Sequence, residues 1–100
     1  MAPVDLAQRL QALEDIEAIR TLKARYLFCC DRKDPQGMRA CFADGPVEID
    51  YGVVGRFETA DALVQVFVEI GCRDHMVEMH HGANPQIELL GPDHARGIWS

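Results

Sequence analysis

The sequence predicts an α+β fold in which helices pack against one face of a mainly antiparallel sheet. Apolar residues recur at helical spacing over a long N-terminal stretch, and shorter segments later in the chain alternate between apolar and polar residues, as half-buried strands do. The expected order is helices, a strand pair, a helix and then consecutive strands, which is typical of the α+β class. One hundred residues suffice for one hydrophobic core, so we expect a single domain over residues 1–100.

Composition and charge argue against several classes of function. The formal net charge of −6 and the lack of a basic cluster argue against a nucleic acid as partner. No apolar run approaches the roughly 20 residues of a membrane span, and the N-terminus lacks the basic and apolar regions of a signal peptide. The cysteines at positions 29, 30, 41 and 72 form no C-x-x-C pair and no ligand spacing that supports zinc, so we expect a reduced, cytoplasmic protein.

The first helix is expected from Asp5 to about Arg32. Its apolar residues form two rows, at spacings of three and four, and the two rows lie on different faces. The apolar direction changes near Asp15, so we expect a bend there, or a short helix that leads into a longer one with Asp15 as its N-cap. The first row is Leu6, Leu10 and Leu13, and the second is Ile16, Ile19, Leu22, Tyr26 and Cys30.

Two shorter helices are indicated by the residues that begin them. Asp34 and Pro35 are typical of an N-cap and the first helical position, and they predict a helix over residues 36–43. Thr59 is a good N-cap for a third helix, which we expect to run to about Ile70. Apolar residues at helical spacing predict that each helix buries one face.

Alternation with a period of two predicts the strands. In the segment before Asn84 it places Glu78 and His80 on the same face. Asn84 and Pro85 interrupt the sheet because proline has no backbone donor. The last predicted strand is followed at once by Ser100, so we expect a sheet that continues further. The predicted strands are residues 47–51, 56–58, 76–83, 86–90 and 94–99.

The candidate chemistry lies in one aspartate and one histidine-rich segment. Asp31 falls in the last turn of the first helix, where the helix dipole disfavours a carboxylate by about 0.3–1 kcal/mol. Three of the four histidines lie in residues 75–81, and histidine is the side chain that titrates near neutral pH. General acid–base catalysis needs two titratable groups in different environments, and Asp31 with one of these histidines would form such a pair.

Plainer interpretations of the same residues stay open. Asp31 can be a solvated carboxylate paired with Arg32 or Lys33, and a single histidine on a strand is more often a structural or surface residue. The alternation places His80 and His81 on opposite faces, which does not favour a metal site. It also leaves open which of the two histidines faces a cavity, because a shift of one residue in register would exchange them.

Five motifs in this order carry a resemblance to a known family. They are Tyr26…Asp31-Arg32-Lys33-Asp34, Phe42-Ala43-Asp44, Glu48-Ile49-Asp50-Tyr51, Gly55…Asp61-Ala62-Leu63 and Met79-His80-His81-Gly82-Ala83-Asn84-Pro85-Gln86-Ile87-Glu88. By their order and spacing the chain resembles the SnoaL-like branch of the nuclear transport factor 2-like superfamily, from about Leu13 to Trp99. The resemblance implies a cone-shaped α+β barrel, in which one long helix and two shorter ones pack in a curved antiparallel sheet around an apolar pocket.

Within this superfamily the nearest chemistry is that of scytalone dehydratase. There an aspartate at the end of the first long helix pairs with a histidine on the third strand, and a tyrosine on the first strand polarises the substrate carbonyl through water. The resemblance assigns these roles to Asp31, His80 and Tyr51. Cys30 stands where that family has a second active tyrosine, and the second catalytic histidine of that family would fall after Ser100.

The resemblance implies a small-molecule enzyme that dehydrates or isomerises a cyclic or polyketide-like carbonyl compound without a metal or other cofactor. The expected partner is a small apolar or aromatic metabolite, and we expect a homodimer or a higher homo-oligomer. The alternative is a non-catalytic ligand-binding or dimerisation domain, since Ile87, Ile98 and Trp99 suit an interface as well as a core. The residues expected to bind the substrate are Tyr26, Cys30, His81, Phe57 and Trp99.

Overall fold

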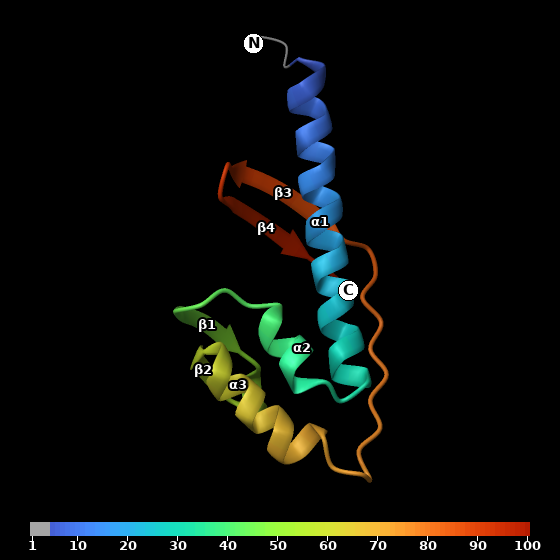
Figure 1. Cartoon of the computed structure of the whole chain (residues 1–100), viewed down its shortest axis with the longest axis vertical. Helices are drawn as coiled ribbons and strands as arrows, with labels where there is room; N and C mark the ends of the chain where they lie inside the picture. Colours follow the sequence, from blue (N-terminus) through green and yellow to red (C-terminus); the bar gives the residue numbers. More distant parts are fainter. Residues whose placement is uncertain (1–4) are drawn as a thin grey trace. The chain divides into compact units, whose positions relative to one another are not determined.

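The computed structural model describes residues 5–100 and confirms the predicted α+β class (Figure 1). The chain forms two compact units: residues 25–80 make one, and residues 81–100 join the chain up to Ala24 to make the other. The elements in chain order are helices α1 (Leu6–Asp31) and α2 (Pro35–Ala40), strand β1 (Pro46–Asp50), the 3₁₀ turn η1 (Gly52–Val54), strand β2 (Arg56–Thr59), helix α3 (Ala60–Val66), the π-helical turn η2 (Phe67–Gly71), and strands β3 (Gln86–Gly91) and β4 (His94–Ile98).

Helix α1 runs without interruption for 26 residues, so the expected alternative of two successive helices is wrong. The segment contains no glycine or proline, and Asp15 accepts a hydrogen bond from the Gln11 side chain (2.8 Å) within the helix instead of capping a new one. At the start of the helix, the Asp5 carboxylate accepts from the Gln8 backbone N–H (2.7 Å) and the Gln8 side chain accepts from the Asp5 N–H (3.2 Å). No helix in residues 5–100 is both long and apolar enough to cross a membrane.

In the unit that contains β3 and β4, the two strands form the predicted antiparallel hairpin. Ala83 and Ser100 continue the pairing, because the backbone N–H of each donates to the carbonyl of the other (3.1 and 2.8 Å). The hairpin turn and α1 near Ile19 enclose a groove of about 370 Å³. The Lys23 ammonium lies 5.5 Å from the centre of the Trp99 ring, at the distance of a cation–π contact.

The unit of residues 25–80 has its own hydrophobic core. Helix α3 contacts α2, β1 and β2, and the end of α1 contributes Cys29 and Cys30 to the buried cluster. The second apolar row predicted for the first helix therefore ends in a core, as expected from its spacing. The buried residues of the cluster are Cys29, Cys30, Met38, Leu63 and Phe67, and the residues packed around them are Tyr26, Phe42, Ile49, Phe57, Val64 and Cys72.

The N-caps predicted for the two shorter helices are confirmed. The Asp34 carboxylate accepts a hydrogen bond from the Gly37 backbone N–H (3.0 Å), and Pro35 follows as the first helical residue. The Thr59 hydroxyl accepts from the Ala62 backbone N–H (3.1 Å) at the start of α3. Helix α2 is shorter than expected and ends at residue 40.

The described strands form two separate two-stranded sheets, where one curved sheet was expected, and residues 5–100 contain no closed barrel. The predicted strand over residues 76–83 is also wrong, since residues 76–82 pair with no strand in the described chain and only Ala83 is paired, with Ser100. Val77 and Met79 are exposed, so the alternation buries no apolar face. A strand needs a neighbour that pairs with its backbone groups, and here the His80 N–H donates instead to the Asp31 carboxylate.

The third helix changes geometry before its end. An α-helix was predicted to Ile70, but α3 ends at Val66 and the following turn is π-helical. A β-carbon on Gly71 would lie 2.7 and 2.9 Å from two ring carbons of Phe67, whose side chain is buried. The missing side chain at Gly71 therefore leaves room for the Phe67 ring in the core.

We predict that Gly71→Ala lowers the free energy of unfolding by about 1–3 kcal/mol, because the new methyl group forces the Phe67 ring out of its place. Gly91→Ala is the matched control, since a β-carbon there would meet no atom within 4 Å. Its effect should stay within about 0.5 kcal/mol. Urea unfolding followed by circular dichroism measures both, and equal stabilities would contradict this packing.

Candidate functional site

Asp31 is the last residue of α1, and the turn that follows fixes its position. Lys33 adopts a left-handed conformation (φ 56°), and the Asp34 and Lys33 N–H groups donate to the carbonyls of Cys29 (2.9 Å) and Cys30 (3.3 Å). These two bonds form a Schellman motif, which satisfies carbonyls that a helix end would otherwise leave unpaired. The chain therefore turns sharply after Asp31 and leaves its side chain at the end of the helix, 22% exposed.

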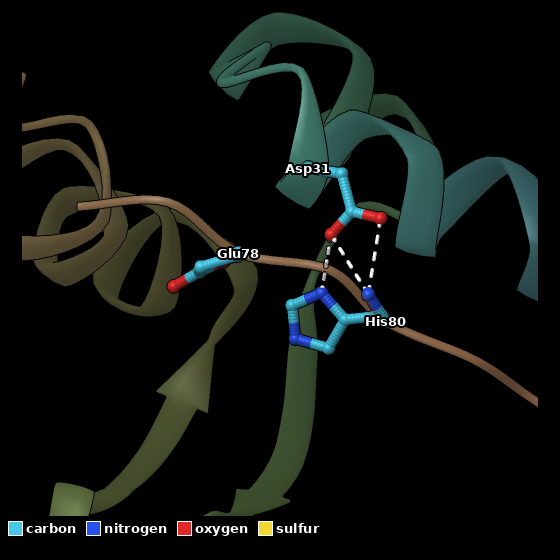
Figure 2. A group of neighbouring side chains, drawn as sticks. All are labelled: Asp31, Glu78 and His80. Carbon is cyan, nitrogen blue, oxygen red and sulfur yellow. Dashed lines mark hydrogen bonds and ion pairs between the residues drawn. The ribbon is translucent and has the colours of Figure 1, made fainter.

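His80 reaches Asp31 from a segment 49 positions further along the chain. Its ring Nδ1 lies 2.6 Å from Asp31 Oδ1, and its backbone N–H donates to both carboxylate oxygens at 3.1 and 3.2 Å (Figure 2). One carboxylate thus holds both the backbone and the ring of the same histidine. The other ring nitrogen, Nε2, lies on the side of the ring away from Asp31 (Figure 2), and the His80 side chain is 41% exposed.

This contact has a defined chemical consequence. An ionised carboxylate only accepts hydrogen bonds, so it selects the imidazole tautomer in which Nδ1 carries the proton. Nε2 then presents a lone pair on the side of the ring away from Asp31. An aspartate that holds one ring nitrogen while the other meets the substrate is the arrangement of an oriented general base.

Glu78 is the third member of this group, and it comes from the same extended segment as His80 (Figure 2). One ligand atom from each of Asp31, Glu78 and His80 lies within 4.8 Å of the other two. The Glu78 side chain is half-buried, and its negative charge helps to raise the pKa of the neighbouring Cys30 thiol. The group combines two carboxylates with one imidazole and can therefore hold either a proton or a cation.

Two tyrosines form a second polar contact in the same unit. The hydroxyls of Tyr26 and Tyr51 lie 2.5 Å apart, and the Tyr26 ring packs edge-on against Phe42 with centroids 5.7 Å apart. Burial, and next the hydrogen bond with Tyr51, raise the pKa of Tyr26 well above its usual range. Burial likewise raises the pKa of Cys30 to about 11. Both groups are therefore protonated near neutral pH and act as neutral polar groups.

Four more predicted site residues have a defined place in this unit. Tyr51 directly follows β1 and is 44% exposed, while Tyr26, Cys30 and Phe57 belong to the core or pack against it. A hydrogen bond with Tyr26 counteracts part of the rise in the pKa of Cys30, so these two predicted pocket residues are neighbours. His81 and Trp99 belong to the other unit, and their part in substrate binding stays a prediction.

Of the histidines left open by the sequence, His80 is the one that contacts Asp31. Glu78 was not among the site residues expected from the sequence. The signal that could have found it was the period-two alternation, which placed Glu78 on the same face as His80. The short distance between Glu78 and Asp31 depends on the path of the segment that carries Glu78. This segment pairs with no strand in the described residues, so no local sequence pattern predicts its path.

Comparison with known proteins agrees with this architecture. The sequence profile of the SnoaL-like domain family matches residues 11–100, which include the three residues of the group and both tyrosines. A search among curated proteins finds no match. Because the profile covers most of the chain, the protein belongs to the SnoaL-like domain family.

Proposed function

We propose that this protein is a small-molecule enzyme in which Asp31 and His80 act as a general acid–base pair. The reaction is the dehydration or isomerisation of a cyclic or polyketide-like carbonyl compound, of the kind that scytalone dehydratase carries out. The observation that supports it best is the 2.6 Å contact between Asp31 and the Nδ1 atom of His80. Family membership adds support, since SnoaL-like proteins are often polyketide cyclases or isomerases.

In the proposed dehydration, Nε2 of His80 removes a proton from the carbon next to the substrate carbonyl. The electron pair of the broken C–H bond forms an enolate, and the hydroxyl on the β-carbon then leaves as the enolate collapses. His80 returns its proton to that hydroxyl, so water and an unsaturated carbonyl compound are the products. Asp31 stabilises the imidazolium that exists between the two proton transfers. In an isomerisation the proton returns to a different carbon.

Tyr51 is proposed to stabilise the enolate oxygen by donating a hydrogen bond. The Tyr51 residue is 44% exposed, and its hydroxyl is oriented by the Tyr26 hydroxyl at 2.5 Å. Because Tyr26 stays protonated at neutral pH, this contact adds no negative charge beside the developing enolate. The Cys30 thiol adds no negative charge either, because burial raises its pKa to about 11.

A second candidate function is a non-catalytic dimerisation or ligand-binding domain. It is favoured by a groove of about 330 Å³ on the β3–β4 hairpin, lined by Ile87, Ile98 and the ion pair between Glu88 and Arg96 (2.6 Å). Ile98 is exposed, so an apolar surface is available there. Ligand binding without turnover in any variant would favour this function over the enzyme.

The acid–base pair predicts a loss of turnover in two variants. His80→Ala should lower the rate by about 10²–10⁴-fold, and Asp31→Asn on the order of 100-fold or more, since they remove the base and the group that orients it. The assay incubates each protein with a panel of cyclic β-hydroxy ketones in D₂O. Loss of water is read from the ultraviolet absorbance of the enone, and α-proton exchange from NMR. The control His75→Ala changes an exposed histidine of the same unit and should leave the rate unaltered.

The tautomer of His80 gives a test that needs no substrate. In a ¹⁵N-labelled chain, two-bond ¹H–¹⁵N correlation spectra should show His80 with its proton on Nδ1. Asp31→Asn should abolish this preference, because an amide can also donate a hydrogen bond to that nitrogen. A proton on Nε2 of His80 in the unaltered chain would contradict the proposed base.

Tyr51→Phe tests the proposed stabilisation of the enolate. Removing one hydrogen-bond donor of this type should lower the rate by about 10²–10³-fold, with KM little changed. The same substitution should change the free energy of unfolding by only about 1 kcal/mol, since it removes one half-exposed hydrogen bond. Unchanged turnover in this variant would remove Tyr51 from the mechanism.

A further inference from the structure

Glu78 places a second negative charge beside the acid–base pair. Its half-buried carboxylate takes part in none of the hydrogen bonds and ion pairs found in residues 5–100, yet it lies within 4.8 Å of Asp31 and His80. Two neighbouring carboxylates repel each other, and partial burial strengthens the repulsion. The proposed proton transfer makes no use of Glu78, so its place in this group calls for another explanation.

The donor atoms of the group suit a divalent transition-metal ion. Zinc binds imidazole nitrogen and carboxylate oxygen at about 2.0–2.2 Å in a tetrahedral arrangement, so two of its ligand atoms lie about 3.3–3.6 Å apart. The three ligand atoms here lie within 4.8 Å of one another, and the 2.6 Å hydrogen bond between Asp31 and His80 has to lengthen by a side-chain rotation to admit the ion. Glu78 has three rotatable side-chain bonds and can move by about 1 Å to reach the tetrahedral spacing.

The choice of ion follows from the mixture of ligands. An imidazole nitrogen beside two carboxylates favours zinc and its neighbours over magnesium and calcium, which prefer oxygen ligands alone. The partial exposure of His80 leaves a route for the ion to enter and room for a water molecule as the fourth ligand.

We propose that Asp31, Glu78 and His80 form an inhibitory site for a zinc-class divalent cation, a role that rests on the proposed acid–base function. The ion takes the lone pair of Nδ1 and displaces the proton held there. That proton moves through solvent to Nε2, so the imidazole stays neutral and no proton is gained or lost. With Nε2 protonated, His80 has no lone pair for the substrate. The metal thus inhibits His80 as a base, because it moves the ring proton from Nδ1 to Nε2.

Calorimetric titration of the full chain with ZnCl₂ tests the site directly. We expect one zinc ion per chain, and at least tenfold weaker binding to Glu78→Gln, which keeps the side-chain shape but loses the charge. His75→Ala is the matched control and should bind zinc as the unaltered chain does, because it removes an exposed histidine outside the group. Circular dichroism checks that each variant is folded.

The tautomer supplies a second readout on the unaltered chain. Zinc is diamagnetic, so the two-bond ¹H–¹⁵N spectra remain observable, and the proton of His80 should move from Nδ1 to Nε2 as zinc is added. Substitution with Co²⁺ identifies the ligand atoms, because thiolate ligands give an intense near-ultraviolet band that oxygen and nitrogen ligands lack. The site described here should give no such band.

Three results would overturn the site: no saturable zinc binding, equal zinc affinity of the unaltered chain and Glu78→Gln, or a thiolate band with Co²⁺. These failures differ from failure of the proposed function. The acid–base role is judged on the metal-free chain, by its turnover and by its His80 tautomer. The metal site is judged by zinc binding, which needs no turnover.

Discussion

The Asp31 carboxylate at the end of α1 is the group on which the rest of the site depends. A negative charge at a helix C-terminus faces the negative end of the helix dipole, so it needs donors from elsewhere. His80 supplies two of them, its backbone N–H and its ring nitrogen. The same contact holds an extended segment that has no strand partner within the described residues. The contact between Asp31 and His80 therefore both stabilises the carboxylate and orients the histidine ring.

Small side chains make this helix end possible. A β-carbon on Gly37 would collide with the Asp34 carboxylate and would lie 2.6 Å from the Cys29 sulfur. The glycine lets α2 begin close to α1, with Asp34 as its N-cap and Cys29 buried beneath it. Because the turn after Asp31 is fixed by this packing, the position of the carboxylate is set by the core and not by solvent-exposed contacts.

The two roles that we propose for the group of Asp31, Glu78 and His80 exclude each other. Proton transfer requires the proton of His80 on Nδ1, whereas a metal ligand at Nδ1 requires it on Nε2. The carboxylate of Glu78 adds little to proton transfer. It adds much to metal binding, since it supplies both negative charge and a ligand atom. The role that we propose for Glu78 is therefore in the regulation of the pair and not in its reaction.

The sequence alone determined what local physics controls. The N-caps Asp34 and Thr59, the β1–β2 and β3–β4 hairpins and the helical rows follow from hydrogen-bonding side chains, turn residues and periodicity. The resemblance to a family supplied the pairing of Asp31 with His80. Tertiary structure decided what depends on distant partners: residues 76–82 lack a neighbouring strand, Leu6, Leu10 and Leu13 stay exposed, and Glu78 lies beside Asp31. Alternation specifies which residues share a face, but only a partner across space makes that face a sheet, a core or a site.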